Sequence, residues 1–139
     1  MQNILTTFGL PNGQLRWPMG DKRVGWIAAE DLADVSATVL AGGPAKHGGQ
    51  NYFLSTDVLN GQEAAAILSE ILGRPIAPVV MTPSDLLAAF ASGAAKSPPG
   101  VEEHYAKSQL EWVQQTYDGR MDYGAVATST VQDLLGRLQ

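Results

Sequence analysis

The sequence has 139 residues and a formal net charge of -5, with 45% hydrophobic and 17% charged residues. These values predict one globular domain, 1–139, that can bury a core, and they exclude disordered and fibrous classes. The absence of cysteine excludes disulfides, thiolate catalysis and cysteine zinc sites. The acidic balance argues against nucleic acid and anionic membranes as partners. Neither a membrane span nor a signal peptide is recognised, so a cytoplasmic protein is expected.

The N-terminal half predicts strands followed by helices. Residues 1–20 are weakly periodic, and Pro11-Asn12-Gly13 indicates a turn. The segment Val24-Gly25-Trp26-Ile27 indicates a buried strand, which leads into a helix that ends at Gly42-Gly43-Pro44. A second strand is predicted over 51–55, centred on Tyr52-Phe53-Leu54. The apolar stripe of the intervening helix is Leu32, Val35, Val39 and Leu40.

The next helix carries the strongest local signals in the chain. Asn60 and Glu63 predict a capping box at its start, whereas Gly73 and Pro75 predict its end. Its apolar face is expected to contain Ala64, Ile67, Leu68, Ile71 and Leu72.

The C-terminal half is mostly helical. A third strand is predicted over 76–81, with Pro78 favouring a sheet edge. Thr82-Pro83 opens a helix that fades at Gly93. A long helix is expected over 101–118, and a short last helix has the apolar positions Val131, Leu134, Leu135 and Leu138. The predicted fold class is α/β, helix-rich, with about three short strands and about five helices.

Local motifs assign no catalytic residue. The glycine-rich segment 42–49 lacks the Lys and Ser/Thr of a phosphate-binding loop and is interpreted as a flexible connection. His47 and His104 form no metal-binding pair, so no metal is expected. Tyr105 and Lys107 are two residues apart, not the four that place the catalytic pair of short-chain dehydrogenases on one helix face. Tyr105 is therefore interpreted as a packing residue.

Aromatic residues near the N-terminus are the remaining candidates for a binding site. Phe8, Trp17 and Trp26 fall where regular structure is weakest. Aromatic residues on loops often line apolar pockets. Filling a small core is an equally good interpretation of the same three residues.

The order of several short motifs resembles a known family. The motifs are Met1-Gln2-Asn3, Val24-Gly25-Trp26-Ile27 before Asp31-Leu32-Ala33, Gly49 with Tyr52-Phe53-Leu54, Glu63 with Leu72-Gly73-Arg74-Pro75, and the closing Leu135-Gly136-Arg137. Over nearly its whole length the chain resembles the C-terminal half of NmrA-like proteins. These are atypical relatives of the short-chain dehydrogenases/reductases and include NAD(P)H-dependent quinone reductases. Ala28 and Thr56 depart from the family pattern, which has Asp and Gly there.

The resemblance implies a Rossmann-like protein whose Gly-rich nucleotide-binding half lies outside this sequence. NAD(P)H is the implied cofactor. Asn3 matches the Asn of a Met-x-Asn segment near the nicotinamide, so it is a candidate for both cofactor and substrate binding. Trp26 matches a residue at the end of a substrate-side strand. Phe8 and Trp17 are substrate-binding candidates by position alone.

The implied function is that of the substrate-side portion of an NAD(P)H-dependent oxidoreductase. The cofactor performs hydride transfer, and this portion orients an apolar, quinone-like acceptor. We expect no activity without the nucleotide-binding half. The expected partners are a chain carrying that half, a small apolar substrate and a second copy of this chain. The alternative is a non-enzymatic regulator that senses NAD(P), or a protein-interaction module.

Overall fold

The computed structural model describes residues 12–94 and 103–137, with side chains in the second range from residue 108 onward. Its secondary structure confirms the helix-rich α/β class, with five α-helices in the described part of the chain. In chain order the elements are β1 (Gln14–Trp17), β2 (Val24–Trp26), α2 (Ala29–His47), β3 (Asp57–Leu59), α3 (Gly61–Leu72), β4 (Ala77–Val80), α4 (Pro83–Ala91), α5 (Glu103–Tyr117), the 3₁₀ helix η2 (Asp122–Gly124) and α6 (Thr130–Leu135).

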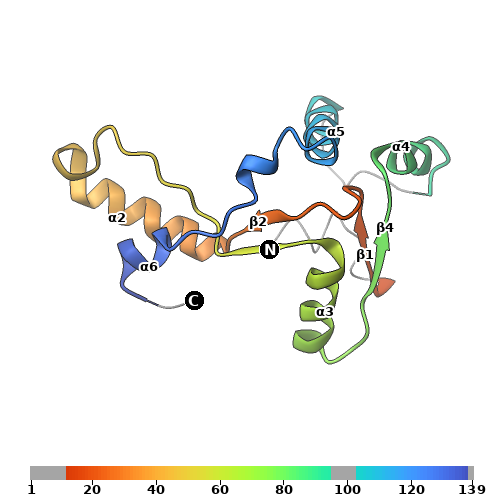
Figure 1. Cartoon of the computed structure of the whole chain (residues 1–139), viewed down its shortest axis with the longest axis horizontal. Coiled ribbons are helices and arrows are strands. Elements are labelled where there is room, and N and C mark those ends of the chain that lie inside the picture. The colour runs from red at the N-terminus through yellow and green to blue at the C-terminus, as the bar shows by residue number, and fades with distance from the viewer. Residues whose placement is uncertain (1–11, 95–102, 138–139) are drawn as a thin grey trace.

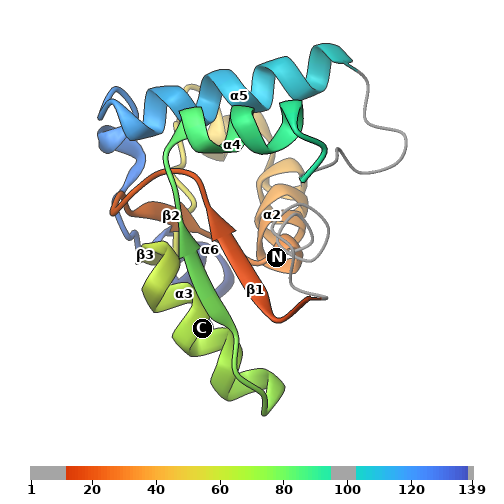
Figure 2. The ribbon, with the colours of Figure 1, turned by 90° about the vertical axis from the view of Figure 1, so that its right-hand side faces the viewer.

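Two small sheets organise these elements. β1 and β4 pair in parallel, with Gln14 opposite Ala77 and Trp17 opposite Val80. α3 contacts both strands and runs beside them, while α4 and α5 lie across the end toward which both strands point (Figure 2). β2 and β3 form a separate antiparallel pair. The carboxyl ends of the two parallel strands therefore lie side by side next to α4 and α5.

The core consists of two apolar clusters that meet at Trp26. One joins β1 to α3 and to Ile76 just before β4, and the other joins the end of β1 to α5. The indole rings of Trp17 and Trp26 stack with centroids 5.9 Å apart and planes 18° apart. The buried members of the two clusters are Leu15, Ala64, Ala65 and Ile76, and Trp17, Met19 and Val113.

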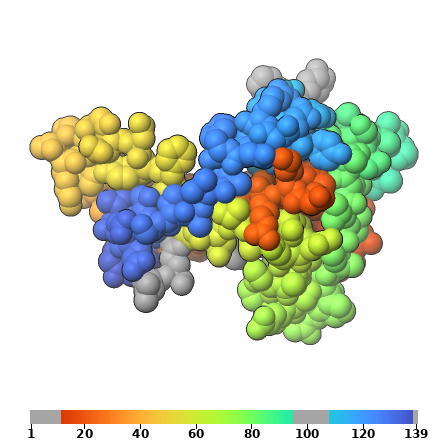
Figure 3. Space-filling view, in the orientation of Figure 1, coloured from red at the N-terminus to blue at the C-terminus, as the bar shows by residue number. Residues whose placement is uncertain are grey.

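α2 and α6 form a lobe at one end of the molecule (Figure 1). In the space-filling view this lobe projects from the body that contains β1, β4 and α3 (Figure 3). Arg137, just after α6, donates hydrogen bonds to Asp31 at 2.6 Å and to Asp34 at 2.8 Å on α2. These ion pairs tie α6 to α2.

The predicted ends of α3 are confirmed, whereas α2 continues beyond its predicted end to His47. The Asn60 side chain accepts the backbone N–H groups of Gln62 and Glu63, and the Glu63 carboxylate accepts the backbone N–H of Asn60 at 3.0 Å. Gly73 ends α3 in the left-handed conformation, at φ 61°. α2 stays regular as far as Gly42, because Gly43 is non-helical at φ 71° and ψ 177° before one further turn.

Other predictions for the N-terminal half are wrong. Residues 51–55 form no strand. Their carbonyls instead accept bonds from Thr128, whose N–H donates to Ser55 at 2.7 Å and whose hydroxyl donates to Phe53 at 2.8 Å. The partner of β2 is β3, and β1 was not predicted although its Gln-Leu-Arg-Trp sequence alternates exposed and buried residues.

The predicted apolar faces are only partly buried. On α2, Val35 is buried, whereas Leu40 is 81% exposed. On α3, the buried face contains Ala64 and Ala65, whereas Ile71 is 69% exposed. The small side chains let α3 approach the parallel strands closely, and Leu68 packs against the same core, whereas Ile67, Ile71 and Leu72 are exposed.

We predict that Gly61→Ala lowers the free energy of unfolding by about 2 kcal/mol, because a Cβ at position 61 would overlap the side chain of Trp17, which is 1% exposed. This strain outweighs the better helix propensity of Ala. Gly124→Ala is the matched control, since nothing lies within 4 Å of a Cβ there. Chemical denaturation measures both variants, and equal stability of the two would contradict the prediction.

Candidate functional site

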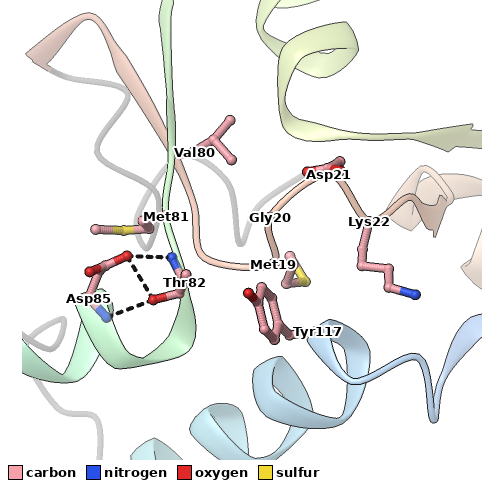
Figure 4. A pocket seen from close by; sticks show the side chains of 9 residues that line it. All are labelled: Met19, Gly20, Asp21, Lys22, Val80, Met81, Thr82, Asp85 and Tyr117. Atoms are coloured by element: carbon pink, nitrogen blue, oxygen red, sulfur yellow. Dashed lines mark hydrogen bonds between the residues drawn. The ribbon is translucent and has the colours of Figure 1, made fainter.

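An open cleft of about 600 Å³ lies at the carboxyl ends of β1 and β4. Its walls come from the loop after β1, the turn from β4 into α4, and the last turn of α5 (Figure 4). In open α/β sheets, ligands bind outside the carboxyl ends of the strands. The cleft is lined by Met19, Gly20, Asp21, Lys22, Val80, Met81, Thr82, Asp85 and Tyr117.

The apolar part of the cleft is built around Tyr117. Its ring lies against Gly20, where a Cβ would come within 3.1 Å of Cε2 and push the ring by a few tenths of an ångström; the φ of 60° at this position also favours glycine. The Tyr117 hydroxyl points toward the space between the two loops (Figure 4). Met19 is fully buried beneath, and Met81, just after β4, is a further lining residue. Thioether and aromatic groups together form an adaptable apolar surface.

The turn from β4 into α4 presents a carboxylate to the cleft. The backbone N–H and the hydroxyl of Thr82 donate to Asp85 Oδ2 at 2.8 Å and 2.7 Å, and the N–H of Asp85 donates to the Thr82 hydroxyl at 3.2 Å. The bond from the Thr82 backbone, followed by that from its hydroxyl, lowers the pKa of Asp85 below its ordinary value. Asp85 is therefore ionised at neutral pH.

The loop after β1 contributes one more acid and a lysine that is already paired. Lys22 donates to both carboxylate oxygens of Asp122, at 3.1 Å and 2.8 Å, and its ammonium points away from the cleft (Figure 4). Asp21 is exposed and has no ion-pair partner among the described residues. The lining therefore has a net negative charge.

The predicted site residues lie apart from this cleft or outside the description. Trp17 is buried, and its indole N–H donates to the carbonyl of Lys22 at 3.2 Å. Trp26 is half-buried between the two core clusters and donates to the carbonyl of Leu59 at 3.3 Å. Neither lines the cleft, although Trp17 packs with Met19 directly below it. Asn3 and Phe8 fall outside the described residues, so substrate binding by these four stays a prediction.

Sequence reasoning missed the cleft because no motif marks it. Its lining residues come from three segments that are distant in the chain and become neighbours only when β1 pairs with β4. The one available signal was the alternation of Gln14 to Trp17, which identifies a strand whose end supplies the loop with Met19 and Gly20.

The described residues do not fit a dinucleotide. Its pyrophosphate needs a Gly-rich turn between a strand and a helix. Three strand-to-helix turns are described, those into α2, α3 and α4, and none contains a glycine. Gly61, the first residue of α3, packs against Trp17. The same part of the chain holds no group of acidic or histidine side chains suited to a metal ion. Within it, no helix has the length and apolarity of a membrane span.

No family model matches the sequence, but known reductases resemble parts of it or its fold. The NAD(P)H azoreductase of Xenophilus azovorans is 37% identical over 85 residues, which are 59% of this chain and 29% of that protein. Triphenylmethane reductase of Citrobacter sp., solved with NADP(H), has a TM-score of 0.68 at 23% identity over 99% of this chain and 46% of its own. An NADPH-dependent quinone oxidoreductase of Escherichia coli has a TM-score of 0.67 at 22% identity, over 92% and 43%.

These similarities define the class of fold. The chain has the α/β fold of the C-terminal portions of NAD(P)-binding reductases, as the resemblance predicted. It spans less than half the length of each of these relatives.

We predict that Thr82→Val raises the pKa of Asp85 part of the way to its ordinary value, because it removes the hydroxyl bonds but keeps the stronger backbone bond. A lowered pKa stabilises the fold above the ordinary value, and this contribution is lost as the pH falls through the folded value. Thr82→Val therefore makes α4 less sensitive to acid. Carboxyl NMR titration measures the change.

The pKa of Asp118 provides an internal reference for this titration. It is lowered by Gln114 and then by Arg120, both far from Thr82 in the chain. An unchanged pKa of Asp85 in the variant, or an equal rise at Asp118, would contradict the prediction.

Proposed function

We propose that this chain is the substrate-side portion of an NAD(P)H-dependent oxidoreductase and that the cleft holds the acceptor. The observation that carries this proposal is an open, partly apolar cleft at the carboxyl ends of two parallel strands, in a fold shared with NAD(P)H-dependent reductases. The named relatives act on azo, triphenylmethane and quinone compounds, which supports an aromatic or quinone-like acceptor.

The residues of this chain bind and orient the acceptor and exclude water from one of its faces. Tyr117 and Val80 supply apolar contact, and the backbone of the loop at Gly20 lies behind the Tyr117 ring. Because no described turn suits a pyrophosphate, the nucleotide is held by a separate portion. We propose a partner chain, or further polypeptide, that carries it, and the isolated chain is then inactive.

We predict that the isolated chain binds the neutral quinone menadione and that Tyr117→Ala weakens this binding about fivefold to tenfold, through loss of ring contact. Quenching of tryptophan fluorescence reports binding, because Trp17 packs on Met19 beneath the cleft. Tyr123→Ala is the matched control, since Tyr123 is 67% exposed and does not line the cleft. Equal loss in both variants would place the quinone elsewhere. Micromolar binding of NADH or NADPH would contradict the separate nucleotide-binding portion.

We also propose that the chain self-associates, because it exposes many large apolar side chains. Leu40 is 81%, Ile71 is 69% and Phe53 is 63% exposed. Light scattering is expected to give a mass above the 14.7 kDa of one chain. Ile71→Glu is expected to shift the population toward monomer if the outer face of α3 forms the contact. A clean monomer of the unaltered chain that binds no hydrophobic dye would show this proposal to be wrong.

A further inference from the structure

We infer that the cleft selects a planar aromatic ligand that carries a positive charge. This inference rests on the proposed function and deepens it, because the ligand is the acceptor of that reaction. It depends on three features of the lining: an aromatic ring packed against Gly20, two carboxylates, and a lysine that is paired with a third carboxylate.

The aromatic ring of Tyr117 favours a flat ligand. Tyr117 is 39% exposed, so part of its surface is free for contact while Gly20 holds its other side. Val80, which is 42% exposed, faces the side of β4 on which Gly20 and Tyr117 lie, whereas the Met81 side chain points to the other side of the strand (Figure 4). A flat ring system can contact Tyr117 and Val80 at once, and a phenol ring also attracts a cation to its face.

The carboxylates define the charge of the ligand. Asp21 and Asp85 both line the cleft and are both exposed, and the bonds from Thr82 keep Asp85 ionised. The N-terminus of α4 offsets part of the charge on Asp85. No such offset acts on Asp21, which stands in the loop after β1. An anionic ligand would be repelled by both carboxylates, whereas a cationic ligand would be attracted by both.

Lys22 does not reverse this preference. Its ammonium is bonded to both oxygens of Asp122 and directed away from the opening. To meet an anionic ligand, Lys22 would have to leave this pair and expose a third carboxylate next to the cleft. The pair thus removes the one cation among the lining residues that could favour a negatively charged ligand.

The test compares three anthraquinones with the same ring system, which carry a trimethylammoniomethyl, a hydroxymethyl or a sulfonate group at the same ring position. Calorimetric titration of the isolated chain measures their dissociation constants at low and high salt. We expect the cationic compound to bind about tenfold more tightly than the sulfonate at low salt, with a smaller ratio at high salt. Similar affinities for the two charged compounds, or no binding of the cationic one, would overturn the inference.

Substitutions at Asp21 separate the charge of the cleft from the overall negative charge of the chain. Asp21→Asn is expected to weaken binding of the cationic compound about threefold and to strengthen binding of the sulfonate by a similar factor. Asp21→Lys is expected to make the sulfonate bind more tightly than the cationic compound. Asp57→Asn removes the same charge from an exposed position in β3 that does not line the cleft. It is expected to leave the affinity for both charged compounds nearly unchanged. Equal effects of Asp21→Asn and Asp57→Asn would overturn the inference, because attraction would then be non-specific.

The neutral anthraquinone distinguishes this inference from the proposed function. If the neutral compound binds in a manner that requires Tyr117, while the two charged compounds bind equally, the proposed acceptor site is supported and the charge selection is wrong. If neither the neutral nor the cationic compound binds, the acceptor site fails as well.

Discussion

The contact between Trp17 and its neighbours is the constraint on which the rest of the structure depends. Its indole ring is almost fully buried, stacks on Trp26 and abuts Gly61 at the start of α3. Trp17 is also the last residue of β1 and pairs with Val80 of β4. One side chain thus fixes the approach of α3, joins the two sheets through Trp26, and sets where the strand ends and the cleft begins.

The position of this side chain explains why the cleft is open to solvent while its floor is rigid. Trp17 and Met19 lie on the interior side of the loop, where they pack with Val113 of α5. Asp21 and Lys22 follow on the exposed side of the same loop. The loop therefore has an apolar base that resists change and a polar rim that can vary without disturbing the core.

Signals that act over a few residues were predictable from the sequence, whereas those that depend on distant partners were not. The capping box of α3 follows from Asn60 and Glu63, three positions apart, and the start of α4 from Thr82 next to Pro83, so both could be identified from the sequence. The strand predicted at Tyr52 to Leu54 was suggested by its aromatic and aliphatic composition, but its carbonyls bond to Thr128, far along the chain. The cleft likewise required the pairing of β1 with β4. The resemblance to a family was recognisable because it rested on the order of short motifs and not on contacts.

The ion pair between Lys22 and Asp122 has a consequence for the time course of folding. The two residues are one hundred positions apart, so their contact can form only when distant parts of the chain have come together. The equilibrium cost of so long a loop is modest, about 0.6 kcal/mol for each doubling of its length. The kinetic cost is larger, because contacts of high sequence separation slow the search for the native topology. We therefore expect the cleft to be completed late in folding, after the helix caps have formed, so a nascent chain gains its place for a ligand last.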